Sequence, residues 1–126
     1  FWGRSIALMG DLTFLHGANG LLIGPAEPRP DLTIVVLNDD GGGIFHTLEQ
    51  GGPEYSHAFE RIYGTPTGTS IESLCAAHGI THHQVTAPEL AQVLETRPSQ
   101  IEVVEVKVSR AGRRALQSVV SGLGAV

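Results

Sequence analysis

Residues 32–45 read Leu-Thr-Ile-Val-Val-Leu-Asn-Asp-Asp-Gly-Gly-Gly-Ile-Phe and contain the strongest structural signal in the chain. The first six are apolar or β-branched, as in a strand that is covered on both faces of a parallel α/β sheet. The run stops at Asn38-Asp39-Asp40, and three glycines follow. Side-chain oxygens beside backbone that bends freely suit a hard cation or a phosphate. Because ligands of open α/β sheets bind beyond the carboxyl ends of the strands, this turn is a candidate site.

A second short apolar run, residues 5–9, lies upstream and ends at Gly10-Asp11. An amphipathic segment, residues 12–23, follows at once and is expected to be a helix. The interval from Asp11 to Asp39 is about that of a strand–helix–strand unit. If the two strands are parallel neighbours, Asp11 and Asn38-Asp39 emerge at the same edge of the sheet.

Gly10-Asp11-Leu12 and Asn38-Asp39 together resemble the thiamine-diphosphate signature of the pyruvate-decarboxylase-like enzymes, Gly-Asp-Gly followed after one such unit by Asn-Asn. Leu12 replaces the third glycine, and Asp39 replaces the second asparagine. Gly-Asp-Leu is the form found in the MenD family, the 2-succinyl-5-enolpyruvyl-6-hydroxy-3-cyclohexene-1-carboxylate synthases of menaquinone biosynthesis. Residues 10–16 and 38–45 are similar to its actinobacterial members, and the similarity continues through residues 59–66 to the end of the chain.

The resemblance covers nearly all 126 residues, but only the C-terminal part of the family's much longer polypeptide. It implies an α/β fold: a mostly parallel sheet with helices on both faces, in the flavodoxin-like three-layer arrangement. Residues 1–126 would then be the thiamine-diphosphate-binding (PP) domain of a larger enzyme, incomplete at its N-terminus. Phe1-Trp2 is accordingly neither an initiator methionine nor a signal-peptide start.

The resemblance also implies the residues of a cofactor site. The carboxylates of Asp11 and Asp39 and the carbonyl of Gly41 would bind Mg²⁺ or Mn²⁺, which neutralises the diphosphate. Asn38 is an alternative side-chain ligand to Asp39, and both aspartates also suit plain turn or cap positions. The residues expected to contact the cofactor are Gly10, Asp11, Leu12, Thr13, Asn38, Asp39, Gly41, Gly42, Gly43 and Ile44.

Ile44, Phe45 and Leu48 are expected on one face of a short helix over residues 44–50. In the family, the matching residues form an apolar wall beside the thiazolium and the substrate, whereas the alternative is that they are plain core. His46 lies close enough in sequence to contact substrate. The glycines 41–43 could instead form a flexible hairpin tip; neither Gly-x-Gly-x-x-Gly nor a P-loop motif occurs.

The implied reaction is that of a thiamine-diphosphate-dependent transferase. It decarboxylates 2-oxoglutarate and adds the succinyl carbanion equivalent to isochorismate. No catalytic base can be named in this chain, because the family's glutamate lies on the pyrimidine-binding domain of a second protomer. The implied partners are the rest of the polypeptide and a homodimer or homotetramer. The alternatives are another enzyme of the same cofactor, such as an acetolactate synthase or a 2-oxo acid decarboxylase, and a non-catalytic flavodoxin-like Mg²⁺-binding module.

Composition excludes several other classes. The formal net charge is −5, and one lysine among eight basic residues argues against a nucleic-acid surface. No apolar run approaches the ~20 residues of a membrane span. The single cysteine, Cys75, is expected to be a small buried hydrophobe and fits a reducing cytoplasm. The six histidines show no zinc-module spacing, and Arg110, Arg113 and Arg114 are expected to form a solvated cluster.

The remaining elements are predicted from periodicity and caps. Residues 51–70 show no period and are expected to be a long loop, which in a compact domain is usually functional or mobile. Residues 101–108 alternate polar and apolar side chains, which predicts a half-exposed strand towards one edge of the sheet. The other expectations are a helix capped by Thr69 or Ser70 and ending at Ala77, a strand at 82–85, helices at 88–95 and 111–120, and a frayed end at 122–126.

Overall fold

The computed structural model of this protein describes residues 3–97 and 100–123. It divides into two compact units, each described here by itself. The first comprises Phe1–Asn38 and Thr69–Lys107, and the second comprises Asp39–Gly68 and Val108–Val126.

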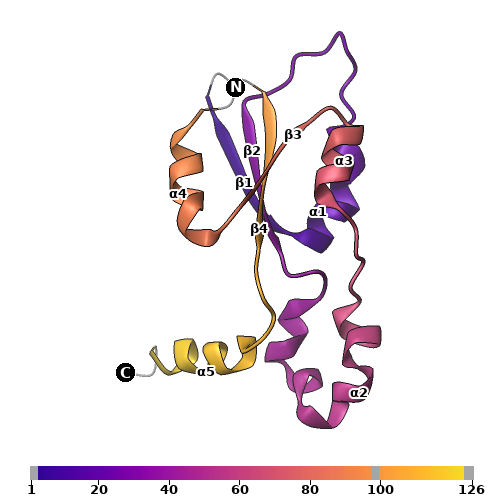
Figure 1. The fold of residues 1–126 in the computed structure, drawn as a ribbon, viewed down its shortest axis with the longest axis vertical. Helices are drawn as coiled ribbons and strands as arrows, with labels where there is room; N and C mark the ends of the chain where they lie inside the picture. Colours follow the sequence, from indigo (N-terminus) through magenta and orange to yellow (C-terminus); the bar gives the residue numbers. More distant parts are fainter. Residues whose placement is uncertain (1–2, 98–99, 124–126) are drawn as a thin grey trace. The chain divides into compact units, whose positions relative to one another are not determined.

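The first unit contains a four-stranded parallel sheet (Figure 1). The strand order is β1-β2-β4-β3, so β1 and β3 lie at the edges and β2 and β4 at the centre. The apolar run of residues 32–37 forms strand β2, as predicted, and β2 is one of the two central strands. The bounds are β1 Ser5–Gly10, β2 Leu32–Asn38, β3 Thr81–Val85 and β4 Ile101–Lys107.

Helices lie on both sides of this sheet, as the sequence predicts: α1 (Asp11–Gly17) and α3 (Ile71–Ala77) on one side and α4 (Ala87–Glu95) on the other (Figure 1). Helix α1 begins one residue before the predicted start and continues as the 3₁₀ helix Ala18–Leu21, because Gly17 and Gly20 are poor α-helix formers. Helix α3 begins as predicted, with the Ser70 hydroxyl oxygen accepting the Ser73 N–H at 3.1 Å.

The buried core of the first unit lies between the sheet and the face covered by α1 and α3. Side chains from β2 and β4 pack there against residues of the two helices, and Cys75 is fully buried among them, as predicted. The core side chains are Phe14, Leu21, Ile34, Val36, Ile71, Cys75, Ile80, Ile101 and Val103.

The prediction of a half-exposed edge strand over residues 101–108 is wrong. Strand β4 pairs with β2 on one side and β3 on the other, and six of its seven residues are buried, Glu102 and Glu105 among them. The order of strands in a sheet is set by pairing between segments that are far apart in sequence. A local alternation of polar and apolar residues therefore cannot predict it.

The second unit contains most of the segment 51–70 predicted to be a loop, and that prediction is wrong for residues 53–64. Residues 53–64 form three consecutive helical turns: the 3₁₀ helix Pro53–Tyr55, α2 (Ser56–Phe59) and the π-helix Glu60–Gly64. The 3₁₀ helices Gly43–Thr47 and Glu49–Gly51 replace the predicted short helix over 44–50. Helix α5 spans Arg113–Leu123, so the predicted closing helix is shifted towards the C-terminus. Of the end expected to fray, residues 122 and 123 are helical, and 124–126 lie outside the described residues.

Candidate functional site

In the first unit, two predicted site residues follow neighbouring strands at the same edge of the sheet. Strands β1 and β2 are parallel neighbours, with Gly10 in register with Leu37. Asp11 therefore leaves β1 at the edge where Asn38 ends β2, which confirms the prediction made from the two apolar runs. Asp11 opens helix α1 and is only 3% exposed. The helix dipole stabilises a carboxylate at this position, and its burial keeps the Asp11 oxygens out of bulk water.

Leu12 and Thr13 complete the first turn of α1, with Leu12 half-buried and Thr13 exposed. Gly10 is the N-terminal flanking residue of that helix, with extended backbone and no side-chain cap bond. These three predicted residues thus lie at the same edge of the sheet as Asp11.

Asn38 belongs to a partly buried polar cluster that sequence reasoning missed. Its Nδ2–H donates to Oε1 of Glu105 at 2.6 Å, and Nε2 of His82 lies 2.9 Å from Oε2 of the same carboxylate. Glu105 is 3% exposed. The sequence did contain a signal. Glu102 and Glu105 are three residues apart, so their side chains point to opposite faces of the strand. A strand with a single exposed face would carry both glutamates on that face.

Cys75 adjoins this cluster. Burial, and secondarily the negative charge of Glu105, raise the pKa of the Cys75 thiol from its ordinary 9.0 to about 11. The thiol is therefore protonated at neutral pH, and Cys75 is not a nucleophile.

We expect Cys75 to resist alkylation by iodoacetamide at pH 8 in the folded protein and to react rapidly in denaturant, as measured by mass spectrometry. Because the folded pKa lies above the unfolded one, the protonated thiol contributes stability below about pH 9 that is lost as the pH rises towards about 11. A Cys75→Ala variant, which lacks the titrating group, should lose this component of the pH dependence. Fast labelling of the folded protein at pH 8 would contradict the assignment.

In the second unit, Asp39 and Asp40 begin the predicted acidic turn and have different partners. The Asp39 carboxylate forms an ion pair with Arg113 and its side chain is 8% exposed. Asp40 adopts a left-handed backbone, with φ +56°, and its Oδ1 accepts the N–H groups of Thr67 and Gly68, each at 3.1 Å. Asp40 is thus the turn-forming residue, whereas Asp39 is a buried carboxylate beside a cation.

The three glycines of the turn are buried and closely packed, which excludes the alternative of a flexible hairpin tip. The Gly42 N–H donates to the Gly64 carbonyl at 2.7 Å. A Cβ at Gly41 would overlap that same carbonyl oxygen, and a Cβ at Gly43 would overlap the Asp39 carboxylate. Only glycine allows the backbone to approach its neighbours this closely.

Of the three residues predicted to form the apolar wall, Ile44 and Leu48 are exposed, and Phe45 is half-buried against Tyr63 with ring centroids 5.6 Å apart. Within the residues that the structure describes, Ile44 and Leu48 are not core side chains. The plain-core alternative therefore holds at most for Phe45.

The prediction of a solvated arginine cluster is wrong, because each arginine binds a group of residues 39–60. Arg113 pairs with Asp39, Arg110 pairs with Glu60 at 2.9 Å, and Arg114 donates to the Leu48 carbonyl at 2.7 Å. These two ion pairs and one hydrogen bond join the start of α5 and the residues before it to the acidic turn and the helical segment after it.

His46 lies among these same elements. Its ring packs on Phe59 at 4.0 Å between centroids, and its buried Nε2 has no hydrogen-bond partner in the described part of the chain; the nearest carboxylate, Glu60, is 3.9 Å away. A cavity of about 220 Å³ adjoins it. The residues that line it are His46, Gly51, Gly52, Pro53, Ser56, Phe59 and Glu60.

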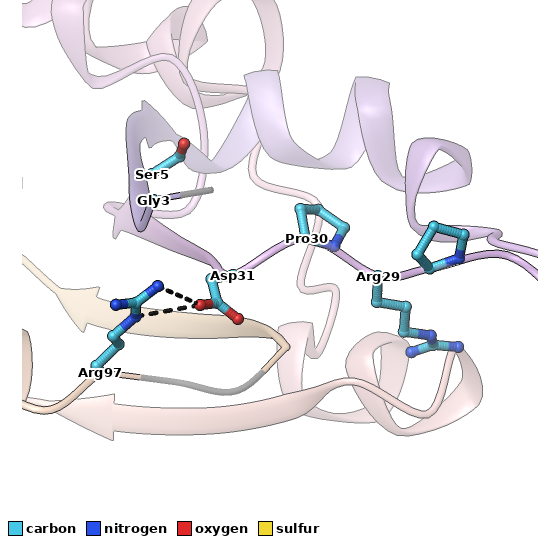
Figure 2. A pocket seen from close by; sticks show the side chains of 7 residues that line it. Gly3, Ser5, Arg29, Pro30, Asp31 and Arg97 are labelled. Atoms are coloured by element: carbon cyan, nitrogen blue, oxygen red, sulfur yellow. Dashed lines mark hydrogen bonds and ion pairs between the residues drawn. The ribbon is translucent and has the colours of Figure 1, made fainter. Parts of the chain in front are cut away.

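A larger pocket of about 580 Å³ lies in the first unit, at the amino ends of β1 and β2 (Figure 2). Ser5 and Asp31 contribute to it, and Asp31 is bound by Arg97 through two hydrogen bonds of 2.8 and 3.1 Å. This is the opposite end of the strands from Asp11 and Asn38. The pocket therefore does not coincide with the predicted site.

Among the described residues, no three His, Cys, Asp or Glu side chains gather as a metal site. The predicted ligand set of two carboxylates and one backbone carbonyl does not require such a group. Its donors fit Mg²⁺ chemically, because all are hard oxygens and the Asp11 carboxylate is buried. The chemistry of these oxygen donors is thus compatible with Mg²⁺.

Comparison with known proteins gives close relatives. The chain is 60% identical over 115 residues to the 2-succinyl-5-enolpyruvyl-6-hydroxy-3-cyclohexene-1-carboxylate synthase of Saccharopolyspora erythraea, covering 90% of this chain and 20% of that protein. It is 57% identical to the enzymes of the same name from Rhodococcus erythropolis (117 residues, 92% of this chain, 22% of that protein) and Nocardia farcinica (119 residues, 94% and 22%).

The chain thus spans about a fifth of the length of the curated relatives it matches. No protein-family model matches it. Across the described ranges, no helix has both the length and the apolar character needed to cross a membrane.

Proposed function

We propose that this chain, a relative of the 2-succinyl-5-enolpyruvyl-6-hydroxy-3-cyclohexene-1-carboxylate synthases over nine-tenths of its length, is the part of such an enzyme that holds the diphosphate and the metal of thiamine diphosphate. The observation that carries the proposal is the placement of Gly10-Asp11 and Asn38 at the carboxyl ends of parallel neighbouring strands, within a sequence 60% identical to a named synthase.

The proposed ligands of Mg²⁺, or of Mn²⁺, are the Asp11 and Asp39 carboxylates and the Gly41 carbonyl. Arg113, which pairs with Asp39, holds that carboxylate in place and would offset its negative charge beside a diphosphate. The close packing of the glycine turn on Gly64 and Asp39 would hold its backbone, the Gly41 carbonyl included, in one conformation. Each residue in this account binds or orients; none is assigned a proton transfer.

When bound, thiamine diphosphate would supply the carbanion chemistry that decarboxylates 2-oxoglutarate and joins the succinyl group to isochorismate. The exposed side chains of Ile44 and Leu48, with Phe45 beside them, would exclude water from the reacting centre. No general base is proposed within the chain. The base, the rest of the polypeptide and the second protomer belong to the proposed homodimeric or homotetrameric enzyme, which we expect in the cytoplasm.

The experiment compares the intact enzyme that carries this chain with the 126-residue chain alone. Calorimetry with thiamine diphosphate, with and without Mg²⁺, and a 2-oxoglutarate decarboxylation assay are made on both. We expect metal-dependent binding and turnover by the intact enzyme, and no turnover by the chain alone, because proximity and orientation are lost when half of a site is missing. Turnover by the chain alone would locate the base within it.

The same measurements separate the alternatives. Binding of Mg²⁺ without thiamine diphosphate would indicate a non-catalytic Mg²⁺-binding module. Turnover of pyruvate in preference to 2-oxoglutarate would indicate an acetolactate synthase or a 2-oxo acid decarboxylase. The sequence identity to named synthases favours neither alternative.

A further inference from the structure

The buried carboxylate of Glu105 needs an explanation that the fold alone does not supply. Val103, Val104 and Val106, its neighbours on β4, are fully buried aliphatic residues, and a fourth would pack there at less cost. Burying a carboxylate on a central strand is unfavourable unless donors surround it, and replacement of buried polar groups by apolar ones is often neutral or stabilising. What the Glu105 carboxyl group does is therefore decided by the donors around it.

Its position and partners indicate that role. Glu105 is in register with Val36 on β2, so its side chain lies on the face that also carries Asn38, close to the carboxyl ends of the strands. The carboxylate receives the Asn38 amide at 2.6 Å on one oxygen and contacts His82 at 2.9 Å with the other. Each carboxylate oxygen of Glu105 thus has a partner, one on β2 and the other on β3.

The contact with Glu105 sets the orientation of the Asn38 side-chain amide. The Asn38 Nδ2 lies against Oε1 of Glu105, so the amide oxygen of Asn38 faces away from that carboxyl group. This hydrogen bond restricts the side chain of Asn38, the last residue of β2, which directly precedes Asp39 and the glycine turn.

We propose that Glu105, held by His82, is a positioning residue that orients Asn38 for the bound metal–diphosphate group. The inference rests on the proposed function and extends it to a residue that touches neither cofactor nor metal. Groups that orient the ligands of a metal site in this way are an established general device.

Glu102 is the matched control. It lies on the same strand, is also a buried glutamate at 9% exposure, and accepts a hydrogen bond from the Thr33 hydroxyl at 2.7 Å, with His83 at 3.6 Å. It points to the opposite face of the sheet and is in register with Thr33, towards the amino end of β2. Like Glu105, it is a buried glutamate with a hydrogen-bond donor and a histidine nearby, but it does not contact Asn38.

The test measures the Kd of thiamine diphosphate at saturating Mg²⁺ by calorimetry, together with the unfolding midpoint, in the intact enzyme. We expect Glu105→Leu to weaken binding by about 10–100-fold. Glu105→Gln should restore most of the affinity, since its amide oxygen still accepts from Asn38. In an Asn38→Ala background, Glu105→Leu should have no further effect on Kd. Glu102→Leu should leave Kd unchanged.

His82→Phe removes one hydrogen-bond partner of Glu105 and leaves Asn38 and Glu105 in place. It is the milder variant and is used if Glu105→Leu does not fold. It should also weaken the binding of thiamine diphosphate. The positioning role would be overturned if Kd is unchanged in Glu105→Leu or, where that variant does not fold, in His82→Phe. It would also be overturned if the losses of affinity from Glu105→Leu and Asn38→Ala are fully additive. Absence of metal-dependent cofactor binding by the wild-type enzyme would instead overturn the proposed function, and this inference with it.

Discussion

Replacing Asp11 with alanine in the intact enzyme is expected to abolish metal-dependent cofactor binding. Asp11 is a buried carboxylate at the carboxyl end of β1 and is a proposed metal ligand. Loss of a residue that merely supports a metal ligand costs about 10–100-fold in affinity, so loss of a ligand should cost at least roughly 100-fold. Calorimetric titration with thiamine diphosphate and Mg²⁺ measures the loss directly, and turnover should fall with it.

Asp39→Asn is the paired control. Asparagine keeps an oxygen for the metal but not the charge that pairs with Arg113, so the variant should keep most of the affinity and activity. If Asp39→Asn is as damaging as Asp11→Ala, the charge of Asp39 is essential and its role is more than that of an oxygen ligand. If Asp11→Ala retains its affinity, the proposed metal site is wrong.

The second large effect is expected at Gly41. Its backbone has φ +131°, a region closed to residues with a Cβ, and an added Cβ would overlap the Gly64 carbonyl oxygen. Backbone strain and overpacking each cost about 1–3 kcal/mol, so Gly41→Ala should destabilise the chain by about 3 kcal/mol or more. Denaturant unfolding of the 126-residue chain measures the change.

Gly68 provides the matched glycine. It also has a positive φ, +62°, but a Cβ there meets nothing within 4 Å. Gly68→Ala should therefore cost only the strain of a left-handed backbone, about 1–2 kcal/mol. Equal losses at the two positions would show that the packing of Gly41 against Gly64 contributes little.

The sequence alone determined strand β2 and the residues at the carboxyl ends of β1 and β2. The apolar run of residues 32–37 is long, β-branched and free of polar residues other than Thr33, and such a run fits few environments except the middle of a parallel sheet. Asp11 and Asn38 follow their strands directly. Their shared edge therefore needed only the inference that the two strands are parallel neighbours. The resemblance to the synthases rests on the same residues, and sequence identity bears it out.

Only the tertiary structure decided what surrounds those residues. Glu105 is buried because β4 lies between β2 and β3, and strand order depends on pairings between residues far apart in the chain. Residues 53–64 form helical turns although they show no periodicity, because contacts such as Gly42 N–H with the Gly64 carbonyl fix them from outside the segment. Arg113 likewise pairs with Asp39 from 74 residues away. Local periodicity reports which faces are apolar, whereas the partner of a buried charge is set by contacts that form only when the chain has folded.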